Sequence, residues 1–183
     1  MTLTNGLVAM TPSSIAYSGT SASINADGSV VFSACLSLSL NGVFTSSYDN
    51  YMITMRTNDS ATGANYFARL RASGTDEASG SNYYTRQSLY INGTGTSAGR
   101  SGDSAFRVKE TGTSKSGFAM YFFGPHLSQP TACRSVVVDS ANSASIYENA
   151  NTHSLSNSYD GITMLSLNSI SFTGLLTVFG FNQ

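Results

Sequence analysis

The sequence predicts an all-β protein, a jelly-roll-like antiparallel β-sandwich of roughly eight to ten strands. Three observations lead to this prediction. Apolar and polar residues alternate with a period of two in many short segments. Clusters of Gly, Asn, Asp and Ser separate these segments, and none has a sustained helical period. The aromatic residues, 11% of the chain, are all Tyr and Phe, which favour strands.

Period-two alternation assigns side chains to faces. In 66–72, Tyr66, Ala68 and Leu70 are expected on one face, opposite two arginines. In 106–110, Arg107 and Lys109 are expected to point outward. The segment 117–124, GFAMYFFG, is apolar on both faces and is therefore expected to be a central strand. The predicted strands, the first two weaker than the rest, are 29–33, 37–41, 51–57, 66–72, 83–91, 106–110, 117–124, 134–140, 162–168 and 174–181.

Turns are expected in three clusters, 58–65, 72–82 and 92–104. The one helical candidate, 11–18, could equally be a strand. Residues 1–20 are expected to form an N-terminal lead-in, a candidate attachment or interface element, and residues 21–183 the β-sandwich domain.

Charge is scarce in this chain. Charged residues make up 10% of it, against about 25% in an average domain. The formal net charge of −1 gives no reason to expect binding to nucleic acid or to an anionic membrane. No apolar run is long enough for a membrane helix, and the N-terminus lacks the pattern of a secretory signal. We therefore expect no membrane insertion.

The two cysteines, Cys35 and Cys133, are interpreted as small buried hydrophobic residues. A disulfide or a reactive thiol is the alternative, which the sequence leaves open.

Two segments resemble each other within the chain. SSYDNYMITMRTN (46–58) and NSYDGITMLSLN (157–168) each place Ser-Tyr-Asp and a turn residue before a strand. Asp49 with Asn50, and Asp160 with Gly161, are interpreted as structural turns in which the carboxylate accepts a bond from the amide two residues on. The echo marks either corresponding strands in two halves of a sandwich or one turn chemistry used twice.

Motifs for catalysis or metal binding are missing. His126 and His153 are far apart and lack a neighbouring carboxylate motif, so no metal site or cofactor is expected. Asp76 and Glu77 are interpreted as part of a solvated loop. The sequence thus indicates a protein that is not an enzyme.

The basic residues are candidates for binding because at least six of them fall inside predicted strands. Those on polar faces could line one sheet surface that binds an acidic glycan or another subunit, or they could protect strand edges. Tyr83, Tyr84 and Tyr90 lie near Arg86, and these four residues are the weak binding candidates. The six basic residues are Arg56, Arg69, Arg71, Arg86, Arg107 and Lys109.

One run also resembles a known family. LSLNGVFTSSYDNYMITMR (38–56) is similar to a module found in tail fibres and other virion proteins of tailed bacteriophages, cyanophages especially. The lead-in 10–34 and the closing stretch 169–182 resemble the beginning and end of the same module, so the resemblance spans nearly the whole chain. It implies an oligomeric, often trimeric, virion component. The residues of the run that carry it are Leu40, Asn41, Val43, Phe44, Tyr48, Asp49, Asn50 and Tyr51.

From this resemblance we expect a bacteriophage virion structural protein, assembled in the host cytoplasm. The first hypothesis is a short tail fibre or fibre tip, a homotrimer that recognises a host-surface polysaccharide. The alternative is a capsid decoration, head-fibre or tail-adaptor protein whose partners are other virion proteins. The sequence has no β-helical shaft, collagen-like repeat or coiled coil. We therefore expect a short fibre, a fibre tip or a decoration on the capsid or tail, and not a long tail fibre.

Overall fold

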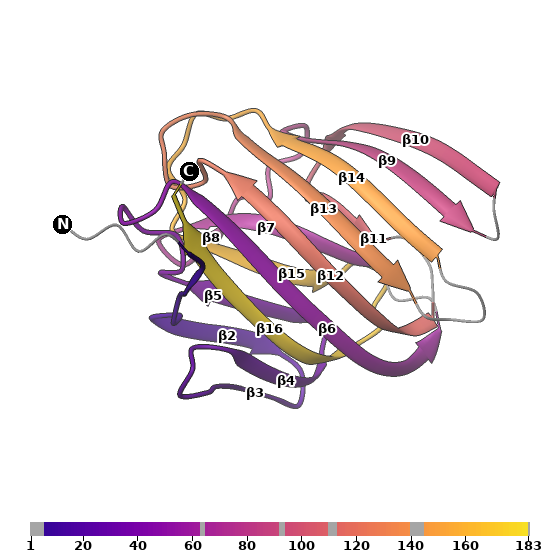
Figure 1. Cartoon of the computed structure of the whole chain (residues 1–183), viewed down its shortest axis with the longest axis horizontal. Coiled ribbons are helices and arrows are strands. Elements are labelled where there is room, and N and C mark those ends of the chain that lie inside the picture. The colour runs from indigo at the N-terminus through magenta and orange to yellow at the C-terminus, as the bar shows by residue number, and fades with distance from the viewer. Residues whose placement is uncertain (1–5, 63–64, 92–93, 110–112, 140–144, 183) are drawn as a thin grey trace.

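Two antiparallel β-sheets pack face to face in this protein (Figure 1). The computed structural model describes residues 6–62, 65–91, 94–109, 113–139 and 145–182. Within these ranges there are sixteen strands and no helix. The predicted antiparallel β-sandwich is confirmed, and its finer description as a jelly roll stays a prediction.

The large sheet has ten strands. β1 (Val8–Ala9) pairs with one end of β16. The spatial order of the other nine is β10 (Thr94–Asp103), β9 (Tyr83–Ile91), β14 (Ser145–His153), β13 (Thr131–Asp139), β12 (Thr113–Phe123), β6 (Asn50–Thr62), β16 (Phe172–Phe181), β4 (Val30–Cys35) and β3 (Ser21–Ile24).

The small sheet has six strands. β8 (Thr75–Asp76) pairs with β7. The order of the other five is β11 (Phe106–Lys109), β7 (Tyr66–Ala72), β15 (Gly161–Ser166), β5 (Ser37–Asn41) and β2 (Ser14–Ser18).

All ten predicted segments are strands, and the helical candidate at 11–18 contains β2. β1 and β2 lie inside the expected lead-in, and each pairs with a strand of one sheet. β10 falls in a region expected to be a turn cluster, because Thr94–Asp103 is rich in Gly and Ser. It is a strand because its backbone pairs with β9 along most of its length. The further strands that the pattern did not predict are β1, β3, β8 and β14, whereas β2 lies in the segment for which a strand was the stated alternative.

The core lies between the sheets and is built from the inward face of each strand. In β12, Phe118, Met120 and Phe122 are buried, whereas the intervening Tyr121 is half-buried on the outer face. β12 pairs with β6 and β13, so its predicted central position is confirmed. Its outer face has no second layer among the described elements, which leaves apolar side chains on the surface of the large sheet.

One end of the sandwich has a polar interior, beneath β9, β13 and β14. Gln87 Nε2 donates to Asn149 Oδ1 at 2.8 Å, and Asn149 Nδ2 donates to Ser135 Oγ at 2.9 Å. Asn149 Nδ2 also donates to the carbonyl of Val108 in β11, which ties the two sheets together. These bonds satisfy buried polar groups that would otherwise destabilise the fold.

Lys109 lies on the inner side of β11, so its predicted outward position is wrong. Arg107 pairs with Phe67 on the outer side of β7, as predicted, but it is buried as well. The register of β11 shifts between these two residues, and this bulge turns Lys109 to the inner side, beside Tyr66. There its Nζ donates to Ser116 Oγ at 2.7 Å and lies 5.4 Å from the centroid of the Tyr66 ring. The amide of Arg107 donates to Thr85 Oγ1, so β9 covers the edge of β11.

The two segments that resemble each other meet at one end of the sandwich. One leads into β6 of the large sheet and the other into β15 of the small sheet. The loop after β12 joins them, because the Gly124 amide donates to the Asp49 carbonyl and the Pro125 carbonyl accepts from the Tyr159 amide, both at 2.9 Å. The two segments thus lie close together, and the choice between the two interpretations of the echo stays open.

Both cysteines are free and buried, so the interpretation as small buried hydrophobic residues is confirmed. Burial raises the pKa of each thiol. Each is therefore a protonated, unreactive thiol at neutral pH.

Candidate functional site

A hollow on the outer face of the large sheet is the strongest candidate site. It has a volume of about 460 Å³, within the range of roughly 300–1,000 Å³ typical of ligand pockets. Its lining residues belong to β10, β9, β14 and β13. These four strands are neighbours in the large sheet (Figure 1). Its lining residues are Arg86, Gln87, Ser88, Gly99, Arg134, Glu148, Asn149 and Ala150.

The register of the strands brings four of these residues into one row across the sheet. Gly99 pairs with Arg86, Arg86 with Ala150, and Ala150 with Arg134. All four are exposed. Two large cationic side chains thus stand on either side of Ala150, and Gly99 lies beyond Arg86. The small residues form a low floor, which is why this part of the face is hollowed.

The adjacent row supplies an acid and a hydroxyl. Glu148 pairs with Ser88 of β9 and forms an ion pair with Arg134. The side chains of Arg134 and Glu148 are 64% and 42% exposed, so this pair is solvated and contributes little to stability. The hollow therefore holds two positive charges and one negative charge.

Arg86 differs from Arg134 in having no partner. Within the part of the chain that the structure describes, its guanidinium makes no hydrogen bond or ion pair. A Cβ added to Gly99 would lie 1.6 Å from Arg86 Nη1, so the guanidinium rests on the backbone of β10. Its five N–H donors remain available to a ligand.

Side-chain hydrogen bonds lie beneath the floor of the hollow. Gln87 and Asn149 point inward from the same strands and belong to the buried polar interior. Thr85 Oγ1 donates to Asn151 Oδ1 at 2.6 Å one step further along. Side-chain bonds between β9 and β14 thus add to their backbone pairing.

The four predicted binding residues do not form one surface. Arg86 is exposed in the hollow, and Tyr84 is exposed on the same face two residues away. Tyr83 is fully buried, because it lies at the opposite parity of β9, and its hydroxyl donates to the Glu77 carbonyl at 2.7 Å. The backbone of Tyr90 pairs with Ile146, but its side chain lies outside the described part.

The predicted row of basic residues on one sheet surface is also not formed. Arg56 and Arg86 lie on the outer face of the large sheet, whereas Arg69 and Arg71 lie on the outer face of the small sheet. Arg107 and Lys109 are buried.

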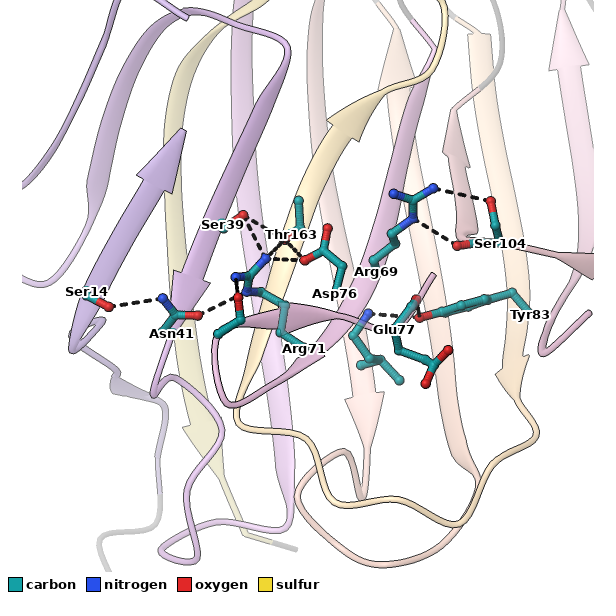
Figure 2. A network of polar contacts seen from close by, with 12 residues as sticks. Ser14, Ser39, Asn41, Arg69, Arg71, Asp76, Glu77, Tyr83, Ser104 and Thr163 are labelled. Carbon is teal, nitrogen blue, oxygen red and sulfur yellow. Dashed lines mark hydrogen bonds and ion pairs between the residues drawn. The ribbon is translucent and has the colours of Figure 1, made fainter. Parts of the chain in front are cut away.

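Arg71 is the centre of a polar network on the small sheet (Figure 2). Nε donates to Asn41 Oδ1 at 3.0 Å, and Asn41 in turn donates to Ser14 Oγ at the sheet edge. Thr163 Oγ1 donates to Asp76 Oδ1 at 2.6 Å, which orients the carboxylate toward Arg71. Because all three guanidinium nitrogens of Arg71 already donate hydrogen bonds within the protein, Arg71 serves as a structural residue. Its partners are Ser39, Asn41, Gly74, Asp76 and Thr163.

His153 is buried at the end of β14, close to Tyr83 and Tyr159. The Tyr159 hydroxyl and His153 Nδ1 are 3.2 Å apart, and the Tyr83 and His153 ring centroids are 4.4 Å apart. Burial lowers the pKa of His153, and the nearby Glu77 carboxylate opposes this in part. A hollow of about 320 Å³ lies outside Tyr159, lined partly by Asp76 and Glu77.

The two predicted turns differ in what their aspartates do. Asp160 Oδ2 accepts a bond from the Ser73 amide at 3.1 Å, across the turn that follows β7, in place of the expected bond from Ile162. A Cβ on Gly161 would lie 2.3 Å from the Leu40 carbonyl oxygen, so glycine serves a close approach of strands there. The carboxylate of Asp49 has no hydrogen-bond partner among the described residues.

The described residues contain no cluster of three or more His, Cys, Asp or Glu side chains arranged for a metal ion. No helix in the described ranges could span a membrane.

Sequence reasoning found Arg86 but missed the rest of the hollow. Glu148 and Ala150 lie in β14, whose inward positions are polar, so period-two hydrophobicity did not mark it. Gly99 lay in a predicted turn cluster. The weak alternation of Ile146, Glu148 and Ala150 against Tyr147 was the available signal.

Comparison with family models, curated proteins and solved structures gave no match.

Proposed function

We propose that this chain is a recognition domain of a bacteriophage virion, a short tail fibre or fibre tip, which binds a host-surface polysaccharide without catalysis. The observation that carries the proposal is the hollow around Arg86, with an unpartnered guanidinium over a floor of small residues. The virion location rests on the sequence resemblance of residues 38–56.

The chemistry of the hollow suits a sugar. Sugar hydroxyls both donate and accept hydrogen bonds, and the hollow offers guanidinium donors, the Glu148 carboxylate and the Ser88 hydroxyl. Tyr84 is 39% exposed beside it and provides an amphipathic ring for an apolar sugar face. The hollow is open to the surface, so it suits a polysaccharide that runs across the sheet.

The same residues favour binding over hydrolysis. Glycosidases use two carboxyl groups on either side of the scissile bond. Among the lining residues that the structure describes, Glu148 is the single carboxylate, and it is paired with Arg134.

A capsid decoration, head-fibre or tail-adaptor protein is the second candidate. It is favoured by an apolar pair on the outer face of the large sheet, Val138 of β13 and Ile146 of β14, which face each other across the two strands and are each more than 40% exposed. Surface of this kind is typical of contacts with other proteins. We propose that copies of this chain cover this pair in a homotrimer that leaves the hollow around Arg86 open.

Antibody labelling of intact virions tests the location. Label at the tips of tail fibres supports the first candidate, and label over the capsid or tail tube supports the second. Binding of the fluorescently labelled protein to host cells tests recognition, with Arg86→Gln compared with Arg56→Gln, an exposed arginine elsewhere on the same sheet face. We expect cell binding that Arg86→Gln abolishes and Arg56→Gln preserves. Absence of cell binding by the native protein would contradict a receptor-binding role.

A further inference from the structure

The charge of the hollow indicates which sugars it takes. Arg134 and Glu148 neutralise each other, whereas the charge of Arg86 is not balanced by any described side chain. The chain as a whole has a formal net charge of −1. The hollow is therefore a local positive site on a protein that is otherwise close to neutral.

The spacing of the two arginines admits a ligand between them. They flank Ala150 in one row, so their Cα atoms are two strand spacings, about 9–10 Å, apart. The Arg86 guanidinium rests over Gly99, on the side of Arg86 away from Ala150. A ligand above Ala150 therefore contacts Arg86 after this flexible, unpartnered side chain rotates toward it. A guanidinium matches a carboxylate by two parallel N–H···O bonds, a geometry that a neutral hydroxyl cannot use.

From these contacts we infer that the hollow binds the carboxylate of an acidic sugar of the uronic acid class, with Arg86 as the main contact. This inference rests on the proposed function, because it names the ligand class of the same site. Arg134 is held by Glu148 until the ligand arrives and then supplies a second, weaker contact. Gly99 keeps space beneath Arg86, so that its guanidinium can lie flat and present its edge to the ligand.

The position of Glu148 gives the inference a directional test. Its negative charge repels an incoming carboxylate and competes for Arg134. Removal of this charge should therefore strengthen the binding of an acidic sugar. A carboxylate that contributed only hydrogen bonds to sugar hydroxyls would have the opposite effect.

The experiment is a titration of the ¹⁵N-labelled full chain, followed by NMR, with methyl glucuronoside and with methyl glucoside. The two probes differ in one group, a carboxylate in place of a hydroxymethyl. We expect the glucuronoside to shift the signals of Arg86, Gly99 and Ala150, with weaker binding at higher ionic strength. We expect Arg86→Gln to weaken binding about tenfold, Glu148→Gln to strengthen it about two- to fivefold, and Arg56→Gln to leave it unchanged.

Several results would overturn the inference. Equal binding of the glucoside would show a neutral sugar site and would leave the proposed function intact. Glucuronoside binding that survives Arg86→Gln would place the acidic sugar elsewhere. Sodium sulfate that binds as tightly as the glucuronoside would make the hollow a general anion site. Absence of binding by either sugar would also refute the inference, whereas the cell-binding assay decides the proposed function by itself.

Discussion

The guanidinium of Arg86 occupies space that exists only because residue 99 is glycine. A Cβ built on Gly99 lies 1.6 Å from Arg86 Nη1 and 2.8 Å from Arg86 Cζ. The two residues pair across β9 and β10, so the contact is fixed by the register of the sheet.

Gly99→Ala should separate binding from stability. The added methyl displaces the flexible end of Arg86, and we expect glucuronoside binding to weaken at least about threefold. Stability should be unchanged or rise by about 0.5–1 kcal/mol, since glycine in a strand interior is unfavourable relative to alanine. NMR titration and thermal unfolding measure the two effects. Gly117→Ala is the matched control, because a Cβ there meets nothing within 4 Å.

The exposed apolar pair of Val138 and Ile146 predicts oligomerisation. Light scattering at micromolar concentration should give three times the 19.2 kDa mass of the chain. Val138→Glu introduces a charge at a position that is 47% exposed, and it should yield a folded monomer. Leu167→Glu, at a residue 48% exposed outside the sheets, should leave the mass unchanged. A monomeric native protein would contradict the proposed trimer.

Arg71→Ala should destabilise the fold by about 3 kcal/mol, because it leaves Asp76 and its neighbours without their buried partner. Urea unfolding measures this effect. Arg56→Ala, at an exposed arginine, should change the free energy of unfolding by less than about 0.5 kcal/mol. Similar values for the two variants would show that the network in Figure 2 contributes little.

The two turn aspartates should respond differently to mutation. Asp160→Ala removes the acceptor of the Ser73 amide and should cost about 1–2 kcal/mol. Asp49→Ala should be close to neutral, since that exposed carboxylate has no partner among the residues described. Thermal unfolding of both variants checks this, and a larger loss for Asp49→Ala would refute it.

Stability should fall as the pH drops below about 6.5, the ordinary pKa of histidine. Burial lowers the pKa of His153 in the folded state, so between the two pKa values the unfolded chain binds a proton that the folded chain does not. Each unit by which the pKa is lowered corresponds to about 1.4 kcal/mol. Above this window both states are neutral, and His153 contributes no pH dependence.

The other titratable groups near His153 keep their charge state through this window. A hydrogen bond from Ser79 lowers the pKa of Glu77, and burial raises the pKa of Tyr83 and Tyr159. Urea unfolding between pH 5 and 8 should show that the free energy of unfolding falls toward low pH in the native protein and in His126→Gln. The fall should be smaller in His153→Gln. An NMR titration of the native protein that gave His153 a pKa above 6.5 would contradict the mechanism.

The sequence alone determined the fold class and the places of ten strands. Alternation in segments such as 51–57 requires a sheet with one buried face, and the apolar segment 117–124 requires a central strand. These are local properties of side-chain period, and they hold whatever the strands pair with.

The tertiary structure decided which strands became neighbours and what their outer faces carry. β14 forms although its inward positions are Asn149, Asn151 and His153, because the buried polar groups of β9 and β13 bond to it. Lys109 is buried because a bulge in β11 changes its face, which period two does not predict.

The candidate site depends on this pairing in the same way. Arg86 was visible in the sequence, but Gly99, Arg134 and Glu148 join it only through the registers of β10, β13 and β14. These three residues are 13, 48 and 62 positions from Arg86 along the chain. The period-two alternation of side chains decides which residues of a strand face the core. The choice of partner strand depends on long-range packing and hydrogen bonding, and that choice created the hollow.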